Sequence, residues 1–203
     1  MQILINIILS YLLGSISGSM VLGRLKGIDI RSMGSGNAGG TNAFRSVGFL
    51  FALGVVFIDI SKGLISVLFL SKISFFNSLS IELIEYSQIL CGLAAVLGHV
   101  YPIYYNFKGG KGAGTLIGVI GILFPQSIFY SLLSWIVVLI FTGFVGLGTI
   151  VASFTLVVIT LLMYPEGILT PFGVFTITMF VFIVFTHRSN IIRMINGTEN
   201  QFK

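Results

Sequence analysis

Charged residues are scarce in this chain: Asp, Glu, Lys and Arg make up 8% of its 203 residues, while 56% are hydrophobic. With a mean hydropathy of +1.06, this composition lies far from that of a soluble globular domain and indicates an integral membrane protein. Because so few charges are present, no long basic face is left outside the bilayer. The net charge of +5 therefore reports first on orientation in the membrane and does not indicate a nucleic-acid ligand.

The chain is also poor in residues that form cross-links or bind metals. Its single cysteine, Cys91, excludes an intramolecular disulfide and lies in an apolar run, where we expect it to pack. Two histidines, one cysteine and six acidic residues show no recognisable metal-ligand spacing and no convincing Ser-His-Asp arrangement. We therefore expect neither a metal nor another cofactor. The N-terminus has no basic stretch or clear cleavage site, so we interpret it as a retained first span.

Apolar runs are plentiful, and a helix needs about 20 such residues to cross a bilayer. Seven runs are candidates for spans: 3–23, 47–70, 86–105, 112–124, 128–141, 147–163 and 170–185. The fourth is short, so we expect it to be tilted or extended beyond the apolar run. Residues 71–87 are polar and could hold a short interfacial helix. The expected fold is an all-α integral membrane protein, with residues 1–203 in a single domain of seven transmembrane helices.

The charges between these runs predict the orientation. One side collects nine basic residues: Arg24, Lys26, Arg31, Arg45, Lys108, Lys111, Arg188, Arg193 and Lys203. The other side has one, Lys72, together with Glu82, Glu85 and Glu166. By the positive-inside rule we expect the N-terminus outside and the C-terminus in the cytoplasm. The polar, glycine-containing segments 34–45, 99–115 and 187–199 then share the cytoplasmic face.

Two features lie within the apolar runs. Gly14 and Gly18 are four residues apart, a spacing that suits close helix packing. Asp59 and Lys62 are three apart in the second run and can pair on one helix face. Charge at membrane depth is often functional, but a structural pair that ties helices together is an equal alternative.

The segment 107–115, with the sequence FKGGKGAGT, suggests a pocket for an anion. Because glycine has no Cβ, consecutive peptide N–H groups can turn inward while the lysines supply positive charge. A positive-inside anchor is the alternative, and Lys108 in particular could be only an anchor. The segment is not a Walker A loop, because Gly112 follows Lys111 where that motif has Ser or Thr, and no strand precedes it.

The other two polar segments carry further candidates. Segment 34–45 alternates glycines with hydroxyl and amide side chains and ends on Arg45, which can bind a phosphate through two parallel hydrogen bonds. A flexible loop is its alternative. In segment 187–199, His187 and Asn190 are one helical turn apart and share a face. His99 and His187 both lie where a span meets the cytoplasm, where anchoring or simple hydrogen bonding is the alternative role.

Three signatures in these segments resemble those of the bacterial acyl-phosphate:glycerol-3-phosphate acyltransferases. They are SGN-G-TN-R in 35–45, GH-P-F-GGKG in 98–112 and HR-NI-R-G-E in 187–199, and the resemblance covers nearly the whole chain. It implies a multi-pass enzyme of the bacterial cytoplasmic (inner) membrane, with seven spans and an active site facing the cytoplasm. The chain departs from the family pattern at a few positions: Ser17 for a common proline, Ala38 and Gly40 for Pro and Ala, and Ala113-Gly114 for Val-Ala. None of these departures removes a polar group.

The resemblance also implies roles for individual residues. It implies that the catalytic residues are Ser35, Arg45, Lys111, His187 and Asn190. Substrate or phosphate binding is implied for Asn37, Gly109, Gly110, Gly112, Thr149 and Arg188, and a supporting role for Thr41, Asn42, His99 and Glu199. Thr149 stands where the family usually has serine. His187 has two candidate roles, general base and substrate positioning.

The implied reaction moves a fatty acyl group from acyl phosphate to the 1-hydroxyl of glycerol 3-phosphate. Its products are lysophosphatidate and inorganic phosphate, in the first acylation of phospholipid synthesis. Acyl phosphate is an activated mixed anhydride, so neither a metal nor a covalent intermediate is required. Membrane lipid and the enzyme that makes acyl phosphate are the further partners expected. The alternative is a small-anion transporter or channel, which the lack of a visible inverted repeat disfavours.

Overall fold

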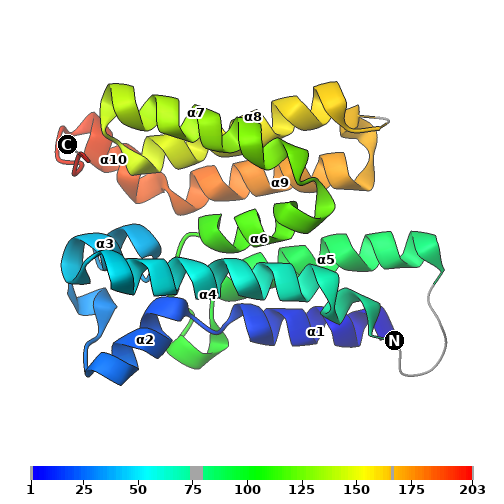
Figure 1. Ribbon diagram of the computed structural model, residues 1–203, viewed down its shortest axis with the longest axis horizontal. Helices are drawn as coiled ribbons and strands as arrows, with labels where there is room; N and C mark the ends of the chain where they lie inside the picture. Colours follow the sequence, from blue (N-terminus) through cyan, green and yellow to red (C-terminus); the bar gives the residue numbers. More distant parts are fainter. Residues whose placement is uncertain (1, 74–79, 166, 203) are drawn as a thin grey trace. The chain divides into compact units, whose positions relative to one another are not determined.

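The computed structural model describes residues 2–73, 80–165 and 167–202, and every regular element in these ranges is a helix. The all-α prediction is therefore confirmed (Figure 1). The chain divides into two compact units, Met1–Leu123 and Phe124–Lys203. Glu166 and Lys203, which entered the charge comparison, lie outside the described residues.

The described residues of the first unit form six α-helices and three 3-10 turns. The helices are α1 (Gln2–Gly14), α2 (Gly18–Lys26), α3 (Gly40–Val47), α4 (Phe49–Leu68), α5 (Ile81–Val100) and α6 (Ala113–Leu123). The turns are η1 (Ile30–Ser32), η2 (Leu70–Lys72) and η3 (Ile103–Tyr105). Together with the turns that follow them, α4 and α5 are long and apolar enough to cross a membrane, whereas α6 has only 11 residues.

The second unit contains α7 (Gln126–Thr142), α8 (Val145–Met163), the turn η4 (Gly167–Leu169), α9 (Pro171–Thr186) and α10 (Arg188–Ile195). Helix α8 packs against both α7 and α9. Among the described helices it is the third that is long and apolar enough to span a membrane. Helices α9 and α10 are together also long and apolar enough, as a pair bent by 52°. Helix α7 has 17 residues and is apolar but shorter.

Helix α5 begins five residues before the predicted run, at Ile81. The hydroxyl of Ser80 accepts a hydrogen bond from the N–H of Leu83 at 3.3 Å, and Glu82 lies in the first turn. A hydroxyl cap and an acidic first turn both stabilise a helix N-terminus. The expected interfacial helix is therefore wrong for residues 81–87, which continue α5, while residues 74–79 lie outside the described ranges.

Glycines bring two helix pairs of the first unit into close contact. Helix α1 lies beside α5, and α4 lies beside α6 (Figure 1). A Cβ added to the glycine would overlap backbone atoms of the partner helix in four pairs: Gly14 with Ala95, Gly98 with Tyr11, Gly63 with Thr115 and Gly118 with Ile60. In lipid, small residues let helix backbones approach and gain van der Waals contact. Close packing at Gly14 is thus confirmed.

The first predicted span is not one continuous helix. It is broken at residues 15–17, and α1 and α2 meet at 44°. Side chains of α4 satisfy the backbone groups at the break: Lys62 Nζ donates to the Ile16 carbonyl at 2.7 Å, and the N–H of Gly18 donates to Asp59 Oδ1 at 3.2 Å. A helix can be interrupted at membrane depth only where other groups replace the lost hydrogen bonds. The break is therefore a tertiary feature that the apolar run does not reveal.

Candidate functional site

Asn42 holds together the loop that carries Ser35 and Asn37. Its side chain is buried, and its Oδ1 accepts the N–H of Ser35 at 2.9 Å. The two N–H groups on its Nδ2 are shared among three backbone carbonyls, those of Ile30 at 3.1 Å, Met33 at 2.9 Å and Asn37 at 3.0 Å. One amide at the start of α3 therefore fixes the path of residues 30–37. Ser35 itself is exposed, on the outside of this loop.

Gly34 allows the loop to pass this close to Asn42. Its φ of +54° lies in the left-handed region, which other residues rarely adopt. A Cβ at this position would overlap Oδ1 of Asn42. The first part of segment 34–45, for which a flexible loop was the alternative, is thus a loop with a defined internal clamp, whereas residues 40–45 belong to α3.

Asp29 and Arg31 stabilise the beginning of the same loop. Asp29 Oδ1 accepts the N–H of Arg31 at 2.9 Å, and its Oδ2 pairs with Arg31 Nη2 at 2.9 Å. These hydrogen bonds from Arg31 hold the pKa of the Asp29 carboxyl below its ordinary value. Arg31 Nη1 also donates to the Tyr105 carbonyl at 3.4 Å, which links the first polar loop to the turn before the glycine-rich segment.

In the glycine-rich segment two peptide N–H groups do not point into a pocket. The N–H of Gly109 donates to the Val100 carbonyl at 3.2 Å, and that of Gly110 donates to the His99 carbonyl at 3.1 Å. The expectation that these N–H groups turn inward on an anion is therefore wrong. Glycine is required at both positions because a side chain would not fit there. A Cβ on Gly109 would overlap the His99 carbonyl, and one on Gly110 would overlap the His99 ring.

Lys111 and Gly112 follow directly and lead into the first turn of α6. Gly112 has φ +94°, and its carbonyl accepts the N–H of Leu116 at 2.9 Å. Lys111 is half-buried, whereas Lys108 is exposed. Lys111 therefore lies next to a helix N-terminus, where the helix dipole and the first N–H groups favour an anion.

His99 belongs to a buried cluster with Asp59 and Lys62. The predicted pairing of the two charged residues is confirmed, with Lys62 Nζ 3.0 Å from Asp59 Oδ1. Lys62 Nζ is also 2.8 Å from His99 Nδ1, and all three residues are at most 3% exposed. That His99 joins the pair was not foreseen. The sequence did contain a reason to expect a third residue. An ammonium group has three donors, so a Lys–Asp pair in an apolar run needs further acceptors nearby.

In the second unit Glu199 connects Asn190 and Arg193. Asn190 Nδ2 donates to Glu199 Oε1 at 2.7 Å, and Arg193 Nε donates to Glu199 Oε2 at 2.6 Å. The Glu199 side chain is only 4% exposed. The carboxylate after α10 thus orients the amide of Asn190, a contact that no spacing in the sequence predicted.

His187 lies between α9 and α10 and is buried. Its Nδ1 is 2.8 Å from the Ile183 carbonyl, one turn earlier. A carbonyl can only accept, so Nδ1 carries the proton and Nε2 of the neutral ring is the acceptor. A backbone carbonyl therefore fixes the tautomer of His187.

Thr149 and Arg188 make local contacts in the second unit. Thr149 Oγ1 donates to the Val145 carbonyl at 3.0 Å within α8. Arg188 is exposed, donates to the Phe185 carbonyl at 3.0 Å and lies over the Phe185 ring at 4.4 Å. Nearby, Gly146 allows α8 to approach Asn190, whose Cβ would lie 3.0 Å from a Cβ on the glycine.

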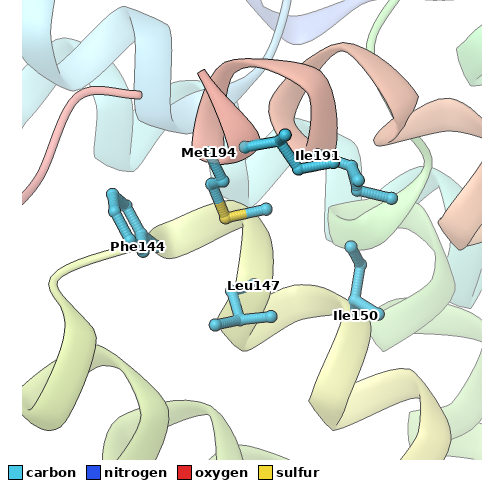
Figure 2. Close-up of a pocket in the computed structure, with 6 residues that line it drawn as sticks. Phe144, Leu147, Ile150, Ile191 and Met194 are labelled. Atoms are coloured by element: carbon cyan, nitrogen blue, oxygen red, sulfur yellow. The ribbon is translucent and has the colours of Figure 1, made fainter. Parts of the chain in front are cut away.

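An apolar cavity of about 460 Å³ lies between α8 and α10. Figure 2 shows Phe144, Leu147, Ile150, Ile191 and Met194 around it, and Ile195 completes the lining. All of the described residues that line it have apolar side chains. It is suited to apolar groups only.

The structure brings the predicted site residues together in two sets. In the first unit Asn42 contacts Ser35 and Asn37, the His99 carbonyl accepts the N–H of Gly110, and Gly109 lies close to the same carbonyl. In the second unit Asn190 contacts Glu199. Thr41 and Arg45 lie on α3, at the end of the first loop. Among the described residues no group of three or more His, Cys, Asp or Glu side chains could hold a metal ion.

The chain is similar to known proteins along its whole length. A family model described as glycerol-3-phosphate acyltransferase matches residues 4–197. A glycerol-3-phosphate acyltransferase of Aquifex aeolicus is 36% identical over 203 residues, covering 100% of both chains. One of Fusobacterium nucleatum is 35% identical and covers 97% of this chain and 96% of the relative.

Two solved structures resemble this one. Both are crystal structures of PlsY (YgiH), an integral membrane glycerol 3-phosphate acyltransferase, in its glycerol 3-phosphate form and its lysophosphatidic acid form. The first has a TM-score of 0.85 at 33% identity and covers 99% of this chain and 96% of that one. The second has a TM-score of 0.83 at the same identity.

The substitution Asn42→Asp tests the loop clamp. It keeps the size of the side chain but removes the amide that donates to three carbonyls, and it places a carboxylate against them. Each buried group left unpaired costs about 1–3 kcal/mol, so Asn42→Asp should lower the free energy of unfolding by at least about 2 kcal/mol. Thermal unfolding in detergent measures this loss. Ser46→Ala is the control, because Ser46 reaches Asn42 Oδ1 only at 3.4 Å; equal stability of the two variants would contradict the clamp.

Proposed function

The chain belongs to the glycerol-3-phosphate acyltransferase family, and from this premise we propose that it transfers a fatty acyl group from acyl phosphate to the 1-hydroxyl of glycerol 3-phosphate. The products are lysophosphatidate and inorganic phosphate. The hydroxyl oxygen bonds to the acyl carbonyl carbon, the bond from that carbon to the phosphate oxygen breaks, and the hydroxyl proton ends on the released phosphate. Because acyl phosphate is an activated mixed anhydride, the reaction requires neither a metal nor a covalent enzyme intermediate.

The observation that carries this proposal is the position of Lys111 at the N-terminus of α6. The preceding glycines are anchored to the end of α5, so the lysine and the first turn of α6 are held in a fixed relation. Both substrates carry a phosphate group, and a lysine beside a helix N-terminus attracts such an anion. Arg45, at the end of α3, supplies a planar guanidinium that suits a second phosphate contact.

Each remaining site residue has a proposed role in the same reaction. Ser35 and Asn37, on the clamped loop, contact substrate, and Thr41 and Asn42 keep that loop in place. Gly109, Gly110 and Gly112 shape the phosphate-binding segment, and His99 supports it. His187 and Asn190 hold glycerol 3-phosphate, with Glu199 orienting the Asn190 amide, and Thr149 and Arg188 assist in binding substrate.

We further propose that residues 1–203 form one seven-span domain in a bacterial cytoplasmic membrane, with the active site and the C-terminus on the cytoplasmic side. Within the described ranges, three long helices, two bent pairs and two shorter apolar helices support seven spans. The charge asymmetry supports the orientation. Acyl phosphate and membrane lipid are the proposed partners, with a functional link to the enzyme that makes acyl phosphate.

Thiol labelling of intact cells tests the orientation. In a Cys91→Ala background, Glu82→Cys should react with an impermeant reagent, and Lys108→Cys should react only after the membrane is opened. Both positions are exposed, so reactivity reports on the side of the membrane. If position 108 alone were labelled in intact cells, the proposed orientation would be wrong.

Purified protein should form lysophosphatidate from acyl phosphate and labelled glycerol 3-phosphate, with acyl-CoA and acyl carrier protein as poor donors. The reason is that the proposed phosphate-binding segments suit a small phosphorylated donor, and the described residues form no large basic domain that would bind a carrier. Product separation on thin layers measures the yield with each donor. Comparable turnover with acyl-CoA would refute the proposed donor.

Lys111→Ala and Arg45→Ala should each lose at least tenfold in rate while the protein inserts and purifies normally. A hydrogen bond to a charged group is typically worth about 1.5–3 kcal/mol, which corresponds to a factor of this size. Lys108→Ala is the matched control, since it removes an exposed lysine three residues away. If Lys108→Ala were the crippling change and Lys111→Ala harmless, the assignment of the phosphate-binding lysine would fail.

His187→Gln separates the two roles proposed for His187. We propose that the phosphate of the donor takes the proton, so the glutamine variant should retain appreciable turnover with a raised KM for glycerol 3-phosphate. A general base would instead give a fall of about 10²–10⁴ in kcat. Steady-state rates measured over a range of glycerol 3-phosphate concentrations give both constants. A kcat loss of that size with unchanged KM would refute substrate-assisted proton transfer.

A further inference from the structure

We propose that Asp59 and Lys62 are positioning residues for this reaction: they hold the His99 ring against Gly110 and thereby fix the glycine-rich segment that carries Lys111. The consequence for phosphate binding rests on the function proposed above. The positioning itself rests only on contacts within the first unit.

Lys62 has no donor left over for a substrate. An ammonium group has three N–H donors and no acceptor. The three acceptors are the Ile16 carbonyl at 2.7 Å, Asp59 Oδ1 at 3.0 Å and His99 Nδ1 at 2.8 Å. With the residue 2% exposed, these contacts use its full capacity. Lys62 therefore acts through protein groups and does not bind substrate itself.

The contact with Lys62 fixes the orientation of His99. Because the ammonium donates, Nδ1 must be the acceptor, so the ring is neutral with its proton on Nε2. Asp59 Oδ1 is farther from Nδ1, at 3.4 Å, and holds Lys62 in place. The opposite edge of the ring, with Nε2, lies against Gly110.

His99 also holds the glycine-rich segment through its backbone. Its carbonyl accepts the N–H of Gly110 at 3.1 Å, and the neighbouring Val100 carbonyl accepts that of Gly109 at 3.2 Å. The ring and the carbonyl of His99 both contact Gly110, the residue before Lys111, and so hold the segment against the end of α5. A shift of the ring would therefore shift the lysine.

A simple structural role has to be separated from positioning, because removal of one charge from a buried pair destabilises a protein whatever the pair does. The double variant Asp59→Asn with Lys62→Met restores neutrality. We expect its melting temperature to recover relative to Lys62→Met alone. Its KM for acyl phosphate should still rise about tenfold or more, the size expected for a lost charge-assisted hydrogen bond, with kcat nearly unchanged. A double variant with recovered stability and the original KM would show that the pair only balances charge.

A second pair of variants tests the contact between ring and glycine, whether or not the first double variant folds. The three atoms nearest to a Cβ on Gly110 all belong to the His99 ring. Gly110→Ala should therefore raise KM by displacing the ring, and His99→Ala should make room for the added methyl group. We expect the double variant to be no worse than His99→Ala alone. If the two effects multiplied as independent changes, the proposed contact would be refuted.

Ser66→Ala is the control on the same helix. Its hydroxyl donates to the Lys62 carbonyl at 2.8 Å, so the variant removes a buried hydrogen bond without touching His99. Its KM should equal that of the unmodified protein, and a tenfold rise would show that any defect in α4 has this effect.

Stabilisation by inorganic phosphate separates this inference from the proposed function. A ligand that binds the folded protein raises its melting temperature. Phosphate should raise the melting temperature of the unmodified protein and of Ser66→Ala, and should do so far less for Gly110→Ala. This pattern without lysophosphatidate formation would overturn the proposed reaction and leave the positioning role standing. Equal stabilisation of all three proteins would overturn the positioning role.

Discussion

The ammonium group of Lys62 is the constraint on which the first unit depends. A charge at membrane depth is tolerated only when its hydrogen-bonding capacity is met inside the protein. The three acceptors come from the α1–α2 break, from α4 and from α5. The Lys62 side chain thus reaches its acceptors only when the first span is interrupted and α4 faces the interruption. The end of α5 must also lie close to both. The glycine contacts between helices make this proximity sterically feasible.

The same requirement explains how two polar loops keep a defined shape. The first is held by Asn42 and the second by backbone hydrogen bonds to the end of α5, so in both cases buried groups are paired before any ligand arrives. Preorganised loops of this kind avoid the cost of ordering on binding. The deep charges Asp59 and Lys62 are likewise paired with groups inside the protein.

The sequence predicted what depends on local composition. Five of the seven apolar runs match a helix to within about two residues at each end, the run 86–105 is displaced by five residues from α5, and α3 and α10 lie outside the runs. The i, i+3 spacing predicted the Asp59–Lys62 pair. Features that depend on distant partners were missed: the break at 15–17, the place of His99 beside Lys62, and the hydrogen bonds that occupy the N–H groups of Gly109 and Gly110. The tautomer of His187 is fixed by a backbone carbonyl, which no residue pattern encodes. The roles of Ser35, Arg45 and Lys111 stay predictions that the variants address.

Amide hydrogen exchange in the glycine-rich segment tests most directly whether the buried cluster fixes that segment. The N–H groups of Gly109 and Gly110 donate to backbone carbonyls, so they should exchange slowly in the unmodified protein. In the Asp59→Asn, Lys62→Met variant the same two amides should exchange at least about tenfold faster, while amides of α8 are unchanged. Equal exchange at Gly109 and Gly110 in the two proteins would contradict the account.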